Sequence, residues 1–134
     1  MKYTIKPSKD GKYIILKIVG EINSQSAMKQ NLEAHALGRE LGIARYLVDV
    51  TEARNTDSVV ENYDFANTDM WETEGIDIYA KVATLVSPED HSHDFIETVA
   101  RNAGLNVRLF NDINQAKKFL MDDYSPNKTD AGDR

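Results

Sequence analysis

Ser58 stands where a regulatory modification would be favoured. The hydrophobic periodicity predicts a helix over residues 58–72, which places Ser58 at the helix amino terminus. The helix macrodipole would stabilise a phosphate at that position. Ser58 to Glu61 also matches a capping box, in which the serine hydroxyl accepts the backbone N–H of Glu61 and the glutamate carboxylate reaches back. Ser58 is therefore both a candidate phosphoacceptor and a candidate helix cap, and Thr56 and Asp57 are alternative caps.

Asp49 and the acids around it could form a paired-carboxylate site or a site for a hard cation. Asp49 lies at the end of the apolar residues of a predicted parallel strand, and functional groups gather at the carboxyl ends of such strands. Glu21, Glu52 and Asp57 could lie nearby. The sequence shows no set of nucleophile, base and orienting group. We therefore interpret Asp49 as an acceptor of backbone N–H bonds in the loop that follows it, and we expect no enzymatic activity, metal or cofactor.

Two histidines, His91 and His93, precede the apolar residues of another predicted helix. Their spacing of two residues suits a metal on a strand or loop, but not on one face of a helix. The sequence supplies no evident third ligand, because His35 belongs to a distant helix. We expect both residues to be exposed to solvent.

The predicted helix over residues 58–72 also carries the aromatic residues that could bind a partner or a ligand. Phe65 falls off the apolar face of this helix and is expected to be exposed, whereas Trp71 is expected to cover the edge of the core. Exposed aromatic side chains mark partner surfaces or ligand pockets, although a neighbouring loop or subunit could equally cover them. The candidates for an apolar ligand site or interface are Tyr63, Phe65, Met70 and Trp71.

The charge distribution narrows the classes of partner. The net charge of -6 disfavours nucleic acid and anionic membrane surfaces. No Lys or Arg lies between Arg54 and Lys81, whereas seven acidic residues do. This acidic stretch is either a solvated helix face or a surface that attracts a basic partner. The candidates for a partner-binding or switch loop are Asp49, Asp57, Glu61 and Asp64.

The composition indicates one globular domain over residues 1–121, followed by a polar tail at 122–134 that we expect to be disordered. The chain contains no cysteine, so disulfides and thiolate metal sites are excluded. No apolar stretch approaches the roughly 20 residues that span a bilayer, so we expect no stable membrane insertion. The amino terminus lacks the apolar core of a signal peptide, which favours a cytoplasmic location.

The periodicity predicts an α/β fold with the element order β-β-α-β-α-β-α-β-α. An antiparallel hairpin turns at Asp10-Gly11 and feeds a mostly parallel sheet covered by helices. In the first helix, Met28, Leu32, Ala36 and Leu41 are expected to form the buried stripe. The predicted strands span residues 3–5, 13–19, 45–50, 79–86 and 107–110, and the predicted helices span 24–41, 58–72, 94–103 and 114–120.

This order and several local sequences resemble the STAS superfamily, and in particular its SpoIIAA-like branch of stand-alone bacterial domains. The fold is also similar to that of CRAL-TRIO lipid-transfer domains. The resemblance covers nearly the whole chain before the tail, and most of it is hydrophobic patterning. The segments that carry it are 14–22, 46–51, 81–86, 95–100, 104–110 and 116–120.

The resemblance implies a phosphorylation site. In the anti-sigma-factor antagonists, a strand ending in Asp is followed by an Asp-Ser pair whose serine is phosphorylated by a partner kinase. Asp49 and Asp57-Ser58, eight residues on, match this spacing. The family motif continues with small residues including Gly, whereas this chain continues with Val59, Val60 and Glu61. The bulkier residues put a family-like docking of the partner in doubt.

Two functions follow as hypotheses. The first is a non-catalytic regulatory domain that binds a protein partner, with control by phosphorylation near the start of the helix at residues 58–72. The second is a carrier of a small hydrophobic or lipid-like ligand in an apolar cleft under that helix, which requires a cavity of a few hundred Å³. An exposed edge strand at residues 3–5 or an exposed helix could also support a homodimer.

Overall fold

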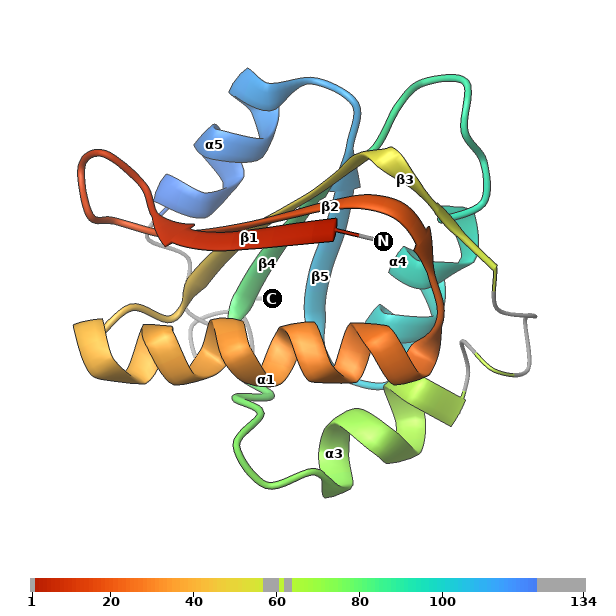
Figure 1. The fold of residues 1–134 in the computed structure, drawn as a ribbon, viewed down its shortest axis with the longest axis horizontal. Helices are drawn as coiled ribbons and strands as arrows, with labels where there is room; N and C mark the ends of the chain where they lie inside the picture. The colour runs from red at the N-terminus through yellow and green to blue at the C-terminus, as the bar shows by residue number, and fades with distance from the viewer. Residues whose placement is uncertain (1, 57–60, 62–63, 123–134) are drawn as a thin grey trace, which may run out of the picture.

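The computed structural model describes residues 2–56, 61 and 64–122. The chain forms one five-stranded sheet with the strand order β1-β2-β3-β4-β5, so each strand pairs with its neighbours along the chain (Figure 1). β1 (Lys2–Pro7) is antiparallel to β2 (Ile14–Ile22), and the turn between them includes Gly11 at a φ of 72°. β3 (Arg45–Asn55), β4 (Lys81–Leu85) and β5 (Asn106–Phe110) continue the sheet in parallel.

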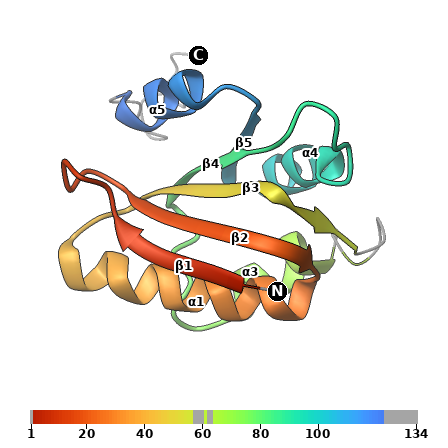
Figure 2. The ribbon, with the colours of Figure 1, turned by 45° about the horizontal axis from the view of Figure 1, so that its top comes forward.

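The helices cover the sheet unequally. α1 (Ser24–Leu41) joins β2 to β3, a π-helical turn η1 (Phe65–Asp69) and α3 (Met70–Glu72) lie between β3 and β4, and α4 (Asp94–Asn102) joins β4 to β5. Each of these segments connects two consecutive parallel strands. Because such connections are right-handed and the strands follow one another in chain order, α1, η1, α3 and α4 all lie on the same face of the sheet. α5 (Ile113–Met121) follows β5 and packs on the opposite face (Figure 2).

The observed elements confirm the predicted order, although the bounds of several elements differ from the predicted ones. β3 extends to Asn55, five residues beyond the predicted end, because it stays paired with β2 after it has left β4. β4 begins at Lys81 rather than at Tyr79, whose side chain is 76% exposed. Of the predicted helix over 58–72, the described residues show a π-helical turn at its carboxyl-terminal half, whereas Ser58 lies outside the described residues.

Two apolar layers hold the sheet between the helices. On the face of α1, Leu16, Ile18 and Val50 belong to one buried cluster. On the face of α5, Leu47 and Leu120 belong to a second cluster. Alternate residues of β3 therefore enter opposite cores, as the two-residue period of a strand requires.

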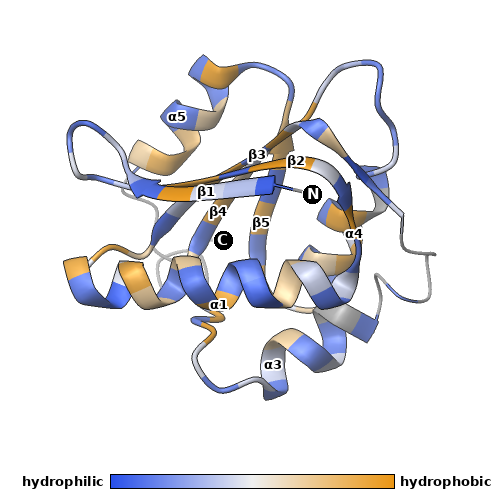
Figure 3. Cartoon of the chain, viewed as in Figure 1, coloured by the Kyte–Doolittle hydropathy of each residue, from blue (hydrophilic) through white to orange (hydrophobic). Residues whose placement is uncertain are grey.

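The predicted buried stripe of α1 is wrong at two of its four residues, whereas Met28 and Leu32 are half-buried. Ala36 is exposed and Leu41 is 47% exposed, whereas the helix buries a face of mostly small or polar residues. This face lets the helix approach the sheet closely, because Gly38 carries no side chain where α1 meets Tyr46. Hydrophilic and hydrophobic residues are interspersed along α1, without a continuous apolar stripe (Figure 3). The buried residues are Gln30, Ala34, His35 and Gly38.

No helix in the described part of the chain is both long enough and apolar enough to cross a membrane.

Candidate functional site

A pocket of about 150 Å³ lies between the sheet and the helices of the more crowded face. Its floor is formed by inward-facing apolar side chains of β2 to β5, and its walls by α1, α3 and α4. The pocket exists because small residues, Ala27, Ala80 and Ala100, occupy lining positions where a larger side chain would fill the space. The lining is overwhelmingly apolar, so the pocket can hold an apolar molecule that water would solvate poorly.

His35 brings a polar group into this lining. Its side chain is only 2% exposed, and its ring stacks on the ring of Tyr46 with 4.5 Å between the centroids. The Nδ1 atom accepts a hydrogen bond of 2.8 Å from the backbone N–H of Asp77. Because Nδ1 accepts, the neutral ring carries its hydrogen on Nε2.

The neutral form of His35 is strongly favoured. Burial lowers the pKa of His35 from 6.5 to about 4, since an imidazolium loses its hydration in the apolar interior. The Asp77 carboxylate acts in the opposite direction and Arg39 adds to the lowering, but burial outweighs the attraction of Asp77. His35 is therefore an uncharged hydrogen-bond donor near neutral pH.

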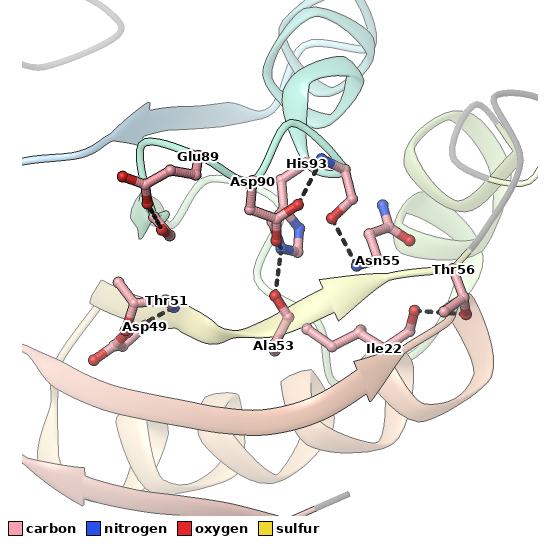
Figure 4. A network of polar contacts seen from close by, with 11 residues as sticks. Ile22, Asp49, Thr51, Ala53, Asn55, Thr56, Glu89, Asp90 and His93 are labelled. Atoms are coloured by element: carbon pink, nitrogen blue, oxygen red, sulfur yellow. Dashed lines mark hydrogen bonds and ion pairs between the residues drawn. The ribbon is translucent and has the colours of Figure 1, made fainter.

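A second buried histidine, His93, also lines the pocket, at the other end of the sheet. Its side chain is 1% exposed, and Nε2 donates to the carbonyl oxygen of Ala53 over 3.1 Å and lies 3.5 Å from Oδ2 of Asp90 (Figure 4). The prediction that both His91 and His93 are exposed is wrong for His93. The local sequence does not indicate that His93 is buried, because the carbonyl that accepts its hydrogen bond belongs to Ala53, 40 residues away along the chain.

Further hydrogen bonds fasten the loop before α4 to the extension of β3. Ser92 Oγ accepts the backbone N–H of Asn55 over 3.0 Å, and Asp90 Oδ1 accepts the backbone N–H of Ser92 over 2.9 Å. Burial alone would raise the pKa of Asp90, but the hydrogen bonds from Ser92 and the charges of His93 and Arg54 lower it. This network joins the loop before α4 to the end of β3, where Asn55 and His93 line the pocket (Figure 4).

Asp49 is engaged within its own strand rather than at a strand end. Its Oδ1 accepts the backbone N–H of Thr51 over 3.0 Å and the Thr51 hydroxyl over 2.7 Å, as expected of a carboxylate that satisfies local backbone. The two bonds span the register shift between β2 and β3. Glu52 pairs with Lys17 over 3.0 Å instead of joining Asp49. Among the described residues, no three acidic or histidine side chains are grouped to hold a metal.

Other predicted site residues are only partly visible. Asp57, Ser58 and Tyr63 lie outside the described residues, as does the side chain of Phe65. Glu61 and Asp64 are exposed. The structure therefore leaves the phosphoacceptor and the switch loop as predictions.

Met70 and Trp71, two of the four predicted apolar site residues, have different environments. Met70 is half-buried, lines the pocket and packs against the cluster of Ala100 and Leu105. Trp71 is 42% exposed, and its indole lies over the backbone of Gly104. Trp71 covers the turn into β5, which agrees with its expected place at the edge of the core.

Comparison with known proteins identifies the fold of the chain and shows no activity for it. No protein-family model matches the chain, and no curated protein matches it significantly. A solved structure of an uncharacterized protein from Shewanella loihica, of the DUF3478 family and with a SpoIIAA-like fold, matches 89% of this chain and 92% of its own with a TM-score of 0.54 and 18% identity. The chain has a SpoIIAA-like fold. The α/β architecture predicted from the periodicity and the resemblance to the SpoIIAA-like branch are thereby confirmed at the level of fold.

Within this SpoIIAA-like fold, sequence reasoning missed the two buried histidines among the polar residues that line the pocket. His35 follows Ala34 and precedes Gly38 on α1, and this run of small residues was the available signal of a closely packed helix face. A polar residue on such a face must be hydrogen-bonded inside the protein. For His93, the sequence carries no comparable signal.

Ser92→Ala is expected to lower the free energy of unfolding by about 1–2 kcal/mol, because it removes the acceptor of the Asn55 N–H in a part-buried place. Urea denaturation measures the change. The matched control is Ser87→Ala, whose hydroxyl donates to the exposed Glu89 and whose loss should cost less than about 0.5 kcal/mol. Equal effects of the two substitutions would contradict the role of the Ser92 bond.

Proposed function

We propose that this SpoIIAA-like domain is a non-catalytic binding domain that holds a small apolar molecule in the pocket between its sheet and the helices α1, α3 and α4. The observation that carries the proposal is the pocket itself, with its volume of about 150 Å³ and its apolar lining. Well-packed interiors contain few voids larger than a water molecule, so a space of this size needs an explanation.

The size of the pocket limits the ligand. Engineered apolar cavities of about 150 Å³ stay dry and bind benzene, whereas pockets for drug-sized ligands span roughly 300–1,000 Å³. The pocket is smaller than the cavity we expected for a lipid carrier. A compact molecule of up to about ten non-hydrogen atoms therefore suits it better than a long acyl chain.

The chemistry of the lining supports binding rather than catalysis. Among the described residues, neither His35 nor His93 is hydrogen-bonded to a side-chain hydroxyl that it could activate. Both rings instead hold backbone groups of other elements. Such contacts fix the walls of a pocket and leave its interior to the ligand.

Toluene is expected to bind the pocket, because transfer of its apolar surface from water is favourable and the pocket needs little rearrangement. Titration followed by amide NMR should shift signals of Val48, Val82 and Ala100, and the melting temperature should rise. Val82→Phe, which fills the pocket from its floor, should abolish both effects.

Ile15→Phe is the matched control, because Ile15 packs on the opposite face with the α5 cluster. This variant should bind toluene as the unaltered protein does. Toluene shifts that are absent from the unaltered protein, or that persist undiminished in a folded Val82→Phe variant, would sink the proposal.

A protein partner is the second candidate, favoured by two exposed aromatic side chains in the part of the acidic stretch that the structure describes. Trp71 is 42% exposed and Tyr79 is 76% exposed, and no Lys or Arg lies between Arg54 and Lys81. Aromatic residues amid acids suit a basic partner surface. Intact mass of the protein from its source cells distinguishes the candidates: a mass lost on denaturation supports the ligand, and a covalent phosphate at Ser58 supports regulated partner binding.

A further inference from the structure

The two nitrogens of the His35 ring have different roles in the pocket. Nδ1 accepts a hydrogen bond from the backbone N–H of Asp77, and the face of the ring stacks on the ring of Tyr46. Nε2, which carries the hydrogen, has no hydrogen-bond partner among the described residues. The side chain is 2% exposed and lines the pocket, so an occupant of the pocket can reach the ring. An acceptor on the occupant could therefore pair with the Nε2–H.

The surrounding charges decide which kind of acceptor is tolerated. The Asp77 carboxylate faces His35 from the segment before β4, and Arg39 faces it from the next turn of α1. The guanidinium of Arg39 is engaged elsewhere, because its Nη1 donates to the carbonyl oxygen of Gly75 over 2.8 Å in a solvent-exposed place. An anionic ligand would therefore meet a neutral imidazole beside a carboxylate, and the described residues that line the pocket include no Lys or Arg to balance its charge.

We propose that the pocket selects uncharged molecules that combine an apolar body with one hydrogen-bond acceptor, and that the Nε2–H of His35 donates to this acceptor. Small ketones, aldehydes, esters and ethers belong to this class. The inference rests on the proposed function, which it deepens by naming the chemistry of the ligand. Carboxylates of the same size are excluded by charge, and hydrocarbons of the same size bind without the hydrogen bond.

Three isosteric probes test the selection. Acetophenone has the carbonyl acceptor, α-methylstyrene replaces this oxygen with a CH₂ group, and benzoate replaces the methyl group with a charged oxygen. The dissociation constants are measured by NMR titration at pH 7. His35→Phe keeps an aromatic ring to stack on Tyr46 and removes the donor.

The decisive quantity is the ratio of the dissociation constants of acetophenone and α-methylstyrene, compared between the unaltered protein and His35→Phe. Differences in the aqueous solubility of the probes cancel in this comparison. We expect the unaltered protein to favour the ketone by roughly threefold to tenfold more than the variant does, the range of one net hydrogen bond. Benzoate should bind at least about a hundredfold more weakly than acetophenone.

A second readout does not depend on the variant. In the unaltered protein, acetophenone should move the Nε2–H proton resonance of His35 downfield, and α-methylstyrene should not. An unchanged ratio in a folded variant, or equal responses of the Nε2–H resonance to both probes, would overturn the inference while the proposed function stands. Failure of the unaltered protein to bind either neutral probe would overturn both.

Discussion

Acidification from pH 7 to pH 4 is expected to lower the free energy of unfolding by about 3 kcal/mol through His35 alone. The cause is the burial of the imidazole, which lowers its pKa from 6.5 to about 4 in the folded protein. An unfolded chain can protonate the same side chain at its ordinary pKa. Protons therefore bind preferentially to the unfolded state and draw the equilibrium toward it.

The sign and the window follow from the two pKa values of His35. Above pH 6.5 the ring is neutral in both states, and the stabilisation is fully present. As the pH falls from 6.5 to about 4, only the unfolded chain takes up the proton, and the stabilisation is lost progressively. The lowered pKa of Asp90 acts only below its ordinary value of 3.8, outside this window.

Urea denaturation at half-unit steps from pH 7 to pH 4 measures this dependence. His35→Gln should remove nearly one proton from the uptake that accompanies unfolding. The slope of the free energy of unfolding against pH should therefore fall by about 1.4 kcal/mol per pH unit in its steepest region. The control is His91→Gln, which removes an exposed histidine that pairs only with Asp94 and should leave the slope nearly unchanged. Parallel profiles for the unaltered protein and His35→Gln would show that another group causes the dependence.

Gly38→Ala is expected to destabilise the protein by more than about 2 kcal/mol, although replacing glycine by alanine in an exposed helix interior stabilises by about 1 kcal/mol. A Cβ at Gly38 would overlap the Tyr46 hydroxyl and lie 2.6 Å from the carbonyl oxygen of Ile43. The backbone of Gly38 is fixed there, because its carbonyl accepts the N–H of Ile43 over 2.8 Å. The helix must therefore move away from β3, which loosens the stack of His35 on Tyr46.

Thermal and urea unfolding measure the effect, and two further variants separate its causes. Gly38→Ala combined with Tyr46→Phe should recover part of the loss, because the second change removes the closer of the two clashing groups. Ala36→Gly, on the exposed face of the same helix, should cost only about 1 kcal/mol through helix propensity. An increase in stability on Gly38→Ala would contradict the close packing of α1.

The fold could be predicted because its determinants are local or periodic. The dense apolar run before Asp49 identifies β3, and Gly42 does end α1 in the left-handed conformation, with a φ of 70°. The buried face of α1 could not be predicted by hydrophobicity. Its buried residues include Gln30 and His35, and the partner of His35 Nδ1 becomes a neighbour only in the folded chain.

The candidate site was less predictable for the same reason. Met70 lies in a periodic apolar pattern and lines the pocket, and its role in binding a ligand stays a prediction. His93 depends on the carbonyl of Ala53 and His35 on the N–H of Asp77, pairs separated by 40 and 42 residues. No local spacing reports such contacts. The volume of the pocket is equally non-local, because it depends on which alanines of different elements face one another.

The agreement between strand order and chain order has a consequence for biosynthesis. A nascent chain can add each strand to the growing sheet as it emerges, because no later strand has to enter between two that are already paired. The face that carries Leu47 and Ala83 is different, since its cover comes from α5. Until residues 113–121 have left the ribosome, this apolar face lacks its helix. Translation arrest before that point would release a protein whose sheet is nearly complete and whose exposed apolar face is prone to aggregation.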